Sequence, residues 1–286
     1  GSSGAFLLTF ISCFDEGQKV GIFNPVYPAY RNILKSLNIE VIEIFPEDSD
    51  ICKIDFRKIE KFKNLDGLII SNPNNPNGQV FSSEELDYIF NFFSKNNISL
   101  ISDEIYHGIE FEKSSKSILN FGQKAIVINS FSKYFLMPGW RLGWTVIPDS
   151  LKENFLKLSQ NLFISSGNIA QYSALKIFEC IDELNETVKK YSITRKQISK
   201  LLSQIKGLNY REPDGAFYFY LDITGFKNNS EKLTKKILNE TGIALTPGTD
   251  FDKKFGHRTL RLAFSSDKLK VIEAVKKLKK WFTQNY

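Results

Sequence analysis

The segment Ser130–Trp144, which reads S-F-S-K-Y-F-L-M-P-G-W-R-L-G-W, contains the residue types for one particular chemistry. Lys133 provides an amine, the serines at 130 and 132 provide hydroxyls, and Arg141 provides a planar guanidinium. Together these groups can hold a dianionic phosphate beside an amine. The combination suits a lysine linked to a phosphorylated aldehyde such as pyridoxal phosphate (PLP), whose ring acts as an electron sink. Taken alone, the pattern also fits a surface lysine in a serine-containing turn.

Polar side chains follow other apolar runs of the sequence as well. Asn75 lies in the loop N-P-N-N-P-N-G, which has too much Asn, Pro and Gly to form a helix or a strand. Asp103 and Tyr106 lie in S-D-E-I-Y, directly after a strand-like apolar run, and Lys133 follows another such run at Ala125–Ile128. Strand ends converge on one crevice in an open α/β sheet, so we expect these groups to meet there.

The first residues, G-S-S-G-A-F, lead directly into a helix-like apolar run. Unpaired backbone N–H groups and the positive end of the helix dipole converge at such a start, so Ser2 and Ser3 are further candidates for binding an anion. Individually, Asp103 fits a helix cap and Asn75 a turn former. In this order, the set favours PLP chemistry, in which Asp103 keeps the pyridine nitrogen protonated and Asn75 and Tyr106 donate to the ring phenolate.

The first half of the chain alternates short apolar runs with helical patterns. This alternation predicts an α/β fold with a mostly parallel sheet sandwiched by helices. The interval between residue 129 and the next strand, which starts near 141, is too short for a crossover containing a helix, so these two strands are expected to be antiparallel. The strands are expected at residues 20–23, 41–45, 68–71, 98–101 and 125–128.

The second half predicts helices followed by a smaller α+β region. A long helical pattern over 182–205 follows two shorter ones at 151–158 and 169–180, and we place the domain boundary inside it. We therefore expect a large PLP-binding domain over residues 1–184 and a small C-terminal domain over 185–286. The small domain should contain strands at 216–221, 243–245 and 260–263, a helix at 230–240, and a terminal helix that buries Leu269, Ile272, Val275 and Leu278.

Composition narrows the remaining function classes. The 286 residues carry a formal charge of +6, but the basic residues are spread out, so we expect no nucleic-acid partner. Three widely spaced cysteines and two histidines predict neither a disulfide framework nor a metal site, and they favour a reducing compartment. No apolar run is long enough to cross a bilayer and no signal peptide is visible, so the expected location is cytoplasmic, without a membrane partner.

Over residues 1 to about 263, the sequence resembles the class I/II PLP-dependent aminotransferases of fold type I. The resemblance rests on N-P-V-Y-P, N-P-N-N-P-N-G, S-D-E-I-Y, S-F-S-K, G-W-R and T-L-R-L-A-F-S. It implies that Lys133 is the Schiff-base lysine, which also moves a proton between the substrate Cα and the cofactor C4′. It implies further that Asp103 pairs with the pyridine nitrogen, while Tyr106 and Asn75 bind the phenolate oxygen.

The resemblance also implies roles for the remaining candidates. Tyr27 would stack on the cofactor ring, and Arg261 would bind the substrate α-carboxylate through paired hydrogen bonds. The implied partners are an amino acid, a 2-oxo acid and a second copy of the chain, and G-S-S-G-A-F is implied to be native sequence, not a tag. The implied phosphate ligands are Ser2, Ser3, Ser130, Ser132 and Arg141.

Two features depart from the family pattern. Asn77 stands where the family usually has threonine, and we expect this change to be tolerated because Asn75 makes the cofactor contact. Family members also carry a substantial segment before the phosphate turn, which covers the substrate and supplies a tyrosine to the partner subunit. The chain begins without that segment, so we expect the N-terminal part of the large domain to be missing.

The resemblance favours an aminotransferase that exchanges an amino group between an L-amino acid and a 2-oxo acid. Two alternatives stay open, a PLP-dependent C–S β-lyase and the aminotransferase-like sensor domain of a transcription regulator. In dicarboxylate-specific relatives, the segment that corresponds to 158–173 often carries a second arginine, but here it contains no arginine or lysine. A buried carboxylate without a partner is costly, so we expect a neutral or aromatic amino donor.

Overall fold

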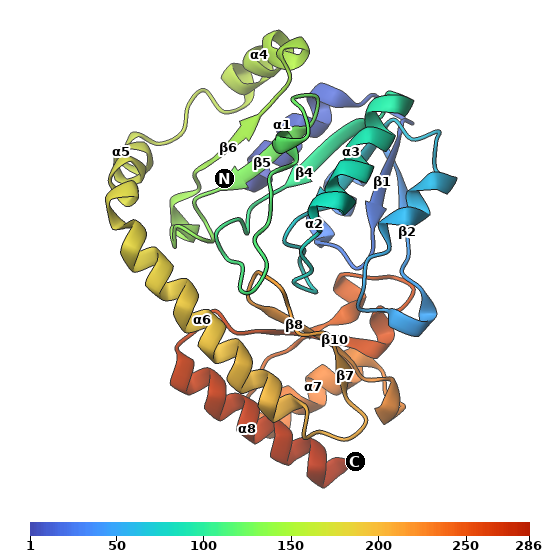
Figure 1. Ribbon diagram of the computed structural model, residues 1–286, viewed down its shortest axis with the longest axis vertical. Helices are drawn as coiled ribbons and strands as arrows, with labels where there is room; N and C mark the ends of the chain where they lie inside the picture. The colour runs from blue at the N-terminus through green and yellow to red at the C-terminus, as the bar shows by residue number, and fades with distance from the viewer.

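The first sheet has six strands in the order β2-β1-β3-β4-β5-β6 (Figure 1). In the computed structural model, which describes residues 1–286, β1 to β5 run parallel and β6 pairs antiparallel with β5. The mostly parallel sheet and its antiparallel pair confirm the prediction made from the short connection. The strands are β1 (Lys19–Phe23), β2 (Glu40–Ile44), β3 (Gly67–Ser71), β4 (Ser99–Asp103), β5 (Ile126–Ser130) and β6 (Gly143–Val146).

Helices cover both faces of this sheet. Successive strand residues point to opposite faces, so β3 packs Ile69 against α1 (Ser2–Cys13) and α2 (Pro28–Ser36), and Leu68 against α3 (Ser83–Asn96). The start of α3 is fixed by a capping box between Ser82 and Glu85, which satisfies two backbone N–H groups. Burial on both faces explains why these strands are short, continuous apolar runs.

The second sheet has four antiparallel strands in the order β7-β8-β10-β9. The helices α6, α7 and α8 share one hydrophobic core with this sheet. The predicted division of the chain near residue 185 falls inside α6 and stays a prediction. The elements are α6 (Ile181–Leu202), β7 (Asn209–Tyr210), β8 (Tyr218–Asp222), α7 (Ser230–Thr241), β9 (Thr246–Pro247), β10 (Thr259–Ala263) and α8 (Lys268–Asn285).

Two details of the C-terminal region differ from the sequence prediction. The strand expected at 243–245 lies at Thr246–Pro247, because only there does the chain reach the edge of β10, where Thr246 pairs with Arg261. Leu269 is 76% exposed, since it lies in the first turn of α8, whereas Val275 and Leu278 are buried as predicted.

Two further helices lie along one side of the molecule. They are α4 (Lys152–Leu162) and α5 (Asn168–Ile177), and α6 continues from α5 toward the second sheet (Figure 1). No helix combines the length and the apolar character needed to cross a bilayer.

Candidate active site

A cavity of about 300 Å³ lies where the carboxyl ends of β3, β4 and β5 meet the second sheet. Residues of both sheets and of the first turn of α1 line it, and we call it the site cavity. It brings together every predicted site residue except Ser130. Those lining residues are Ser2, Ser3, Tyr27, Asn75, Asp103, Tyr106, Ser132, Lys133, Arg141 and Arg261.

Ser130 lies behind the wall of the site cavity. It is 1% exposed, and its hydroxyl lies 2.9 Å from the carbonyl oxygen of Leu142 and 2.8 Å from the hydroxyl of Ser132. In this arrangement Ser130 supports Ser132, which lines the cavity. Direct binding of a phosphate by Ser130 stays a prediction.

Lys133 extends from the loop after β5 into the site cavity. Its Nζ lies 5.7 Å from the ring centres of Tyr106 and Phe217. Burial lowers the pKa of this amine, and the positive charge of Arg261 lowers it further, while Asp103 acts in the opposite direction. A lysine with a lowered pKa offers more of its neutral, nucleophilic form.

Asp103 ends β4 and is 4% exposed. One carboxylate oxygen accepts the backbone N–H of Ile105 at 3.1 Å, and the other accepts the hydroxyl of Tyr30. Burial raises the pKa of Asp103 to about 6, although both hydrogen bonds and the charge of Lys133 oppose the shift. Because its hydrogen bonds favour the ionised form, Asp103 can act as the anionic partner of a positively charged group in the cavity.

Two donors on the wall of the site cavity are held by neighbours. Asn75 accepts a hydrogen bond from Nη1 of Arg261 through Oδ1 at 2.9 Å, so its amide N–H groups can donate into the cavity. The hydroxyl of Tyr106 lies 2.8 Å from that of Tyr218, and burial raises the pKa of Tyr106 well above its usual value. Tyr106 therefore keeps its proton and can act as a donor.

Asn77 supports the loop that carries Asn75. Its amide donates to the carbonyl of Cys52 at 2.9 Å, and its Oδ1 accepts from the amide of Asn74 at 2.8 Å. Asn77 is buried and does not line the site cavity. These contacts agree with the expectation that the asparagine at this position is tolerated.

The first turn of α1 and Arg141 form one end of the site cavity. A Cβ atom on Gly1 would lie only 2.8 Å from Nη2 of Arg141, so the absence of a side chain there leaves the guanidinium beside the helix start. The hydroxyls of Ser2 and Ser3 lie at the same end, and both serines line the cavity. Helix N–H groups, hydroxyls and a guanidinium together form a site for a phosphate-sized anion.

Arg261 lies on β10 between two aromatic rings. Its guanidinium carbon is 4.4 Å from the ring centre of Tyr218 and 4.6 Å from that of Phe251. Nη2 donates weakly to Thr246 at 3.3 Å, and the buried Nε–H has no partner. A fixed guanidinium with unused donors can bind a carboxylate group.

Sequence reasoning missed Tyr218 and Tyr30. Tyr218 lies across the cavity from β4 in space but more than a hundred residues away in the chain, and no local pattern marks it. The sequence marks Tyr30 only by its place three residues after Tyr27, the residue that precedes α2.

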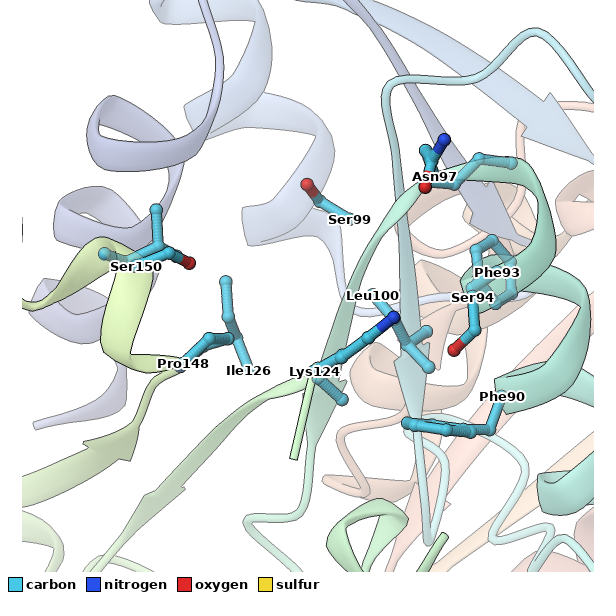
Figure 2. A pocket seen from close by; sticks show the side chains of 13 residues that line it. Phe90, Phe93, Ser94, Asn97, Ser99, Leu100, Lys124, Ile126, Pro148 and Ser150 are labelled. Carbon is cyan, nitrogen blue, oxygen red and sulfur yellow. The ribbon is translucent and has the colours of Figure 1, made fainter. Parts of the chain in front are cut away.

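A second cleft of about 370 Å³ lies at the opposite ends of β4 and β5. Figure 2 shows Phe90 and Phe93 on one side, Pro148 and Ser150 on the other, and Lys124 between them. Lys124 is the only ionisable side chain among the lining residues. Although this cleft is larger, the site cavity alone combines an amine, a buried carboxyl group and two guanidinium groups.

Comparison with known proteins gives a consistent family signal. A family model described as aminotransferase class I and II matches residues 1–278. A Mycobacterium tuberculosis protein named valine–pyruvate aminotransferase is 36% identical over 98% of this chain and 74% of its own length. A Methanocaldococcus jannaschii protein named (5-formylfuran-3-yl)methyl phosphate transaminase is 33% identical over 99% of this chain and 74% of its own.

Solved structures agree with the sequence matches. The crystal structure of an aminotransferase from Mycobacterium tuberculosis superposes with a TM-score of 0.94 at 35% identity, covering 100% of this chain and 75% of the other. A putative aminotransferase from Silicibacter pomeroyi gives a TM-score of 0.93 at 35% identity, covering 100% and 77%.

Proposed function

Because this chain belongs to the class I and II aminotransferase family, an enzyme family that exchanges amino groups between amino acids and 2-oxo acids, we propose that it binds PLP in the site cavity and prefers a neutral amino donor. The observation that carries the proposal is the convergence of Lys133, Asp103 and Arg141 on one cavity. Members of the family are generally PLP-dependent, and the donor groups of this cavity suit the two ends of that cofactor.

The phosphate end is assigned to the first turn of α1 with Ser2, Ser3, Ser132 and Arg141. At the other end, Asp103 would be the anionic partner of the ring nitrogen, and Tyr27 would be the aromatic residue against the ring. When bound, PLP withdraws electrons from the substrate and so makes its Cα proton acidic.

The chain's own residues supply proton transfer and orientation. With PLP bound, the amine of Lys133, whose pKa is lowered by burial, would be the residue that holds the cofactor aldehyde, and its Nζ would take the proton from the substrate Cα and return it. Arg261 binds the α-carboxylate with two parallel hydrogen bonds. Asn75 and Tyr106 would donate hydrogen bonds to the ring oxygen, and their neighbours Arg261 and Tyr218 hold them in place.

The charges in the site cavity support a neutral amino donor. Its three cationic side chains are Lys133, Arg141 and Arg261, and each already has a role in the proposal. A side-chain carboxylate of the substrate would then be desolvated without a partner among these residues. The name of the relative that is 36% identical, valine–pyruvate aminotransferase, also agrees with a neutral donor.

An amino-donor panel tests this proposal. The assay uses the full-length enzyme with one keto acid. We expect kcat/KM for valine, alanine, methionine or phenylalanine to exceed kcat/KM for aspartate by at least about tenfold. Burying one unpaired carboxylate costs more than about 1 kcal/mol, and this cost would fall on aspartate alone. Arg261→Lys is the matched control, since it should lower all donors alike. A clear preference for aspartate would refute the proposal.

A second assay, run with and without the keto acid, separates transamination from β-elimination. A C–S β-lyase releases pyruvate and ammonia from cysteine-like substrates without a keto acid, whereas an aminotransferase depends on the keto acid. The matched relatives are named as aminotransferases or transaminases. These names favour turnover that depends on the keto acid over both the lyase and the sensor-domain alternatives.

We also assign a homodimer to this chain. The support is a group of exposed apolar side chains around α5, which a soluble monomer rarely leaves uncovered. Ile164 is 84%, Ile169 77% and Tyr172 73% exposed; Ile169 and Tyr172 belong to α5, and Ile164 lies just before it. Figure 1 shows α5 at the end of α6 that is farther from the second sheet.

Light scattering on the full-length protein tests the dimer. The wild type is expected at twice the chain mass, and Ile169→Glu with Tyr172→Glu at the mass of one chain, because two charges cannot be desolvated in an apolar interface. Leu269→Glu is the control, since Leu269 is equally exposed but lies on α8, and this variant should stay dimeric. A monomeric wild type would contradict the assignment.

The proposed location is the cytoplasm. The three cysteines, Cys13, Cys52 and Cys180, are all unpaired, which fits a reducing compartment.

A further inference from the structure

Tyr30 is a buried tyrosine whose hydroxyl meets the carboxylate of Asp103. It lies in the first turn of α2, three residues after the N-cap residue Tyr27, and is 0% exposed. Its ring packs against Phe6, with ring centres 4.8 Å apart, and against the edge of Tyr27 at 5.6 Å. These contacts fix the ring, so the hydroxyl has one defined direction.

Asp103 receives a side-chain hydrogen bond only from Tyr30. Its Oδ1 accepts the backbone N–H of Ile105, and its Oδ2 accepts the Tyr30 hydroxyl. Burial raises the pKa of Tyr30 well above its usual value, so the phenol keeps its proton and is the donor. A buried carboxylate is costly without donors, and each of these two bonds favours the ionised form of Asp103.

We propose that Tyr30 is a positioning residue for the reaction, whose hydroxyl holds the Asp103 carboxylate ionised and aimed at the ring nitrogen of the cofactor. This inference rests on the proposed PLP function. Without the hydroxyl, one oxygen of Asp103 loses its only protein donor, and the side chain can both rotate and take up a proton more readily. The attraction between the carboxylate and the protonated ring nitrogen then weakens.

Tyr30→Phe tests the inference because it removes the hydroxyl and keeps the ring. The dissociation constants of the full-length apoenzyme are measured for PLP and for a PLP analogue whose ring nitrogen is replaced by CH. PLP is expected to bind about tenfold more weakly to the variant, the effect of one hydrogen bond to a charged group. The analogue has no ring nitrogen to meet Asp103, so its affinity should change less than about twofold.

A matched variant controls for loss of a buried hydroxyl. Tyr220 is also almost fully buried, and its hydroxyl bonds to Thr259 at 2.6 Å, away from Asp103. Tyr220→Phe should leave both dissociation constants unchanged while lowering the melting temperature by about as much as Tyr30→Phe does.

The outcomes separate the possible roles. Equal weakening of PLP and analogue by Tyr30→Phe would mean a structural role and would overturn the inference, as would no weakening of either. A second measurement uses Asp103→Asn, in which Tyr30→Phe should add less than about twofold to the loss of PLP affinity, because the ionised partner is already gone. If the wild-type protein binds the analogue as tightly as PLP, the role of Asp103 is wrong, and the role of Tyr30 fails with it. If the wild-type protein binds neither compound, the cofactor assignment itself is wrong.

Discussion

Lys133→Ala is expected to lower amino transfer by on the order of 10⁴-fold, because it removes both the covalent attachment and the proton carrier. No other amine lines the site cavity, and a guanidinium group is no substitute for an amine as a nucleophile or proton carrier. The rings of Tyr106 and Phe217 remain in the alanine variant, but the amine whose pKa burial lowers is gone.

Borohydride trapping checks this result independently of turnover. The full-length protein reconstituted with PLP should show a visible absorption band that borohydride fixes onto Lys133, and the alanine variant should show neither. Lys124→Ala is the matched control, because Lys124 also lines a cleft but lies at the opposite ends of the strands (Figure 2). A reducible band that survives in Lys133→Ala would show that another amine holds the cofactor.

Asp103→Asn is expected to retain PLP but to lower kcat by roughly 10³-fold, the scale of losing one preorganised electrostatic group of an active site. The amide oxygen can still accept the N–H of Ile105, and the amide NH2 can donate to the oxygen of Tyr30, so the local packing stays. It cannot hold positive charge at the ring nitrogen, and the ring loses its capacity to withdraw electrons. The phosphate end of the site cavity, with Arg141, is unchanged and keeps the cofactor bound.

Glu104 provides the control for this substitution. It is the adjacent buried acid, its pKa is raised to about 7 by burial, and its carboxylate accepts the backbone N–H of Ile118 outside the site cavity. Glu104→Gln should change stability more than kcat. Near wild-type turnover in Asp103→Asn, measured by single-turnover kinetics with saturating donor, would refute the assigned role.

The sequence by itself determined the layered α/β fold and most of the residues that line the site cavity. Strands buried on both faces are continuous apolar runs. The start of α3 can be predicted from the capping box that Ser82 and Glu85 form. Parallel strands end at the same edge of a sheet, so groups that follow them, such as Asp103 and Lys133, must converge. These are local or topological rules, and a single sequence contains the information they need.

Only the tertiary structure decided contacts between segments that are far apart in the chain. It placed Tyr218 against Tyr106, directed Tyr30 at Asp103, and turned Ser130 toward the carbonyl of Leu142, away from the site cavity. The position of β9 at residues 246–247 was likewise set by its pairing with β10. Such contacts depend on side-chain direction and strand register after packing, which the spacing of residues along the chain does not fix.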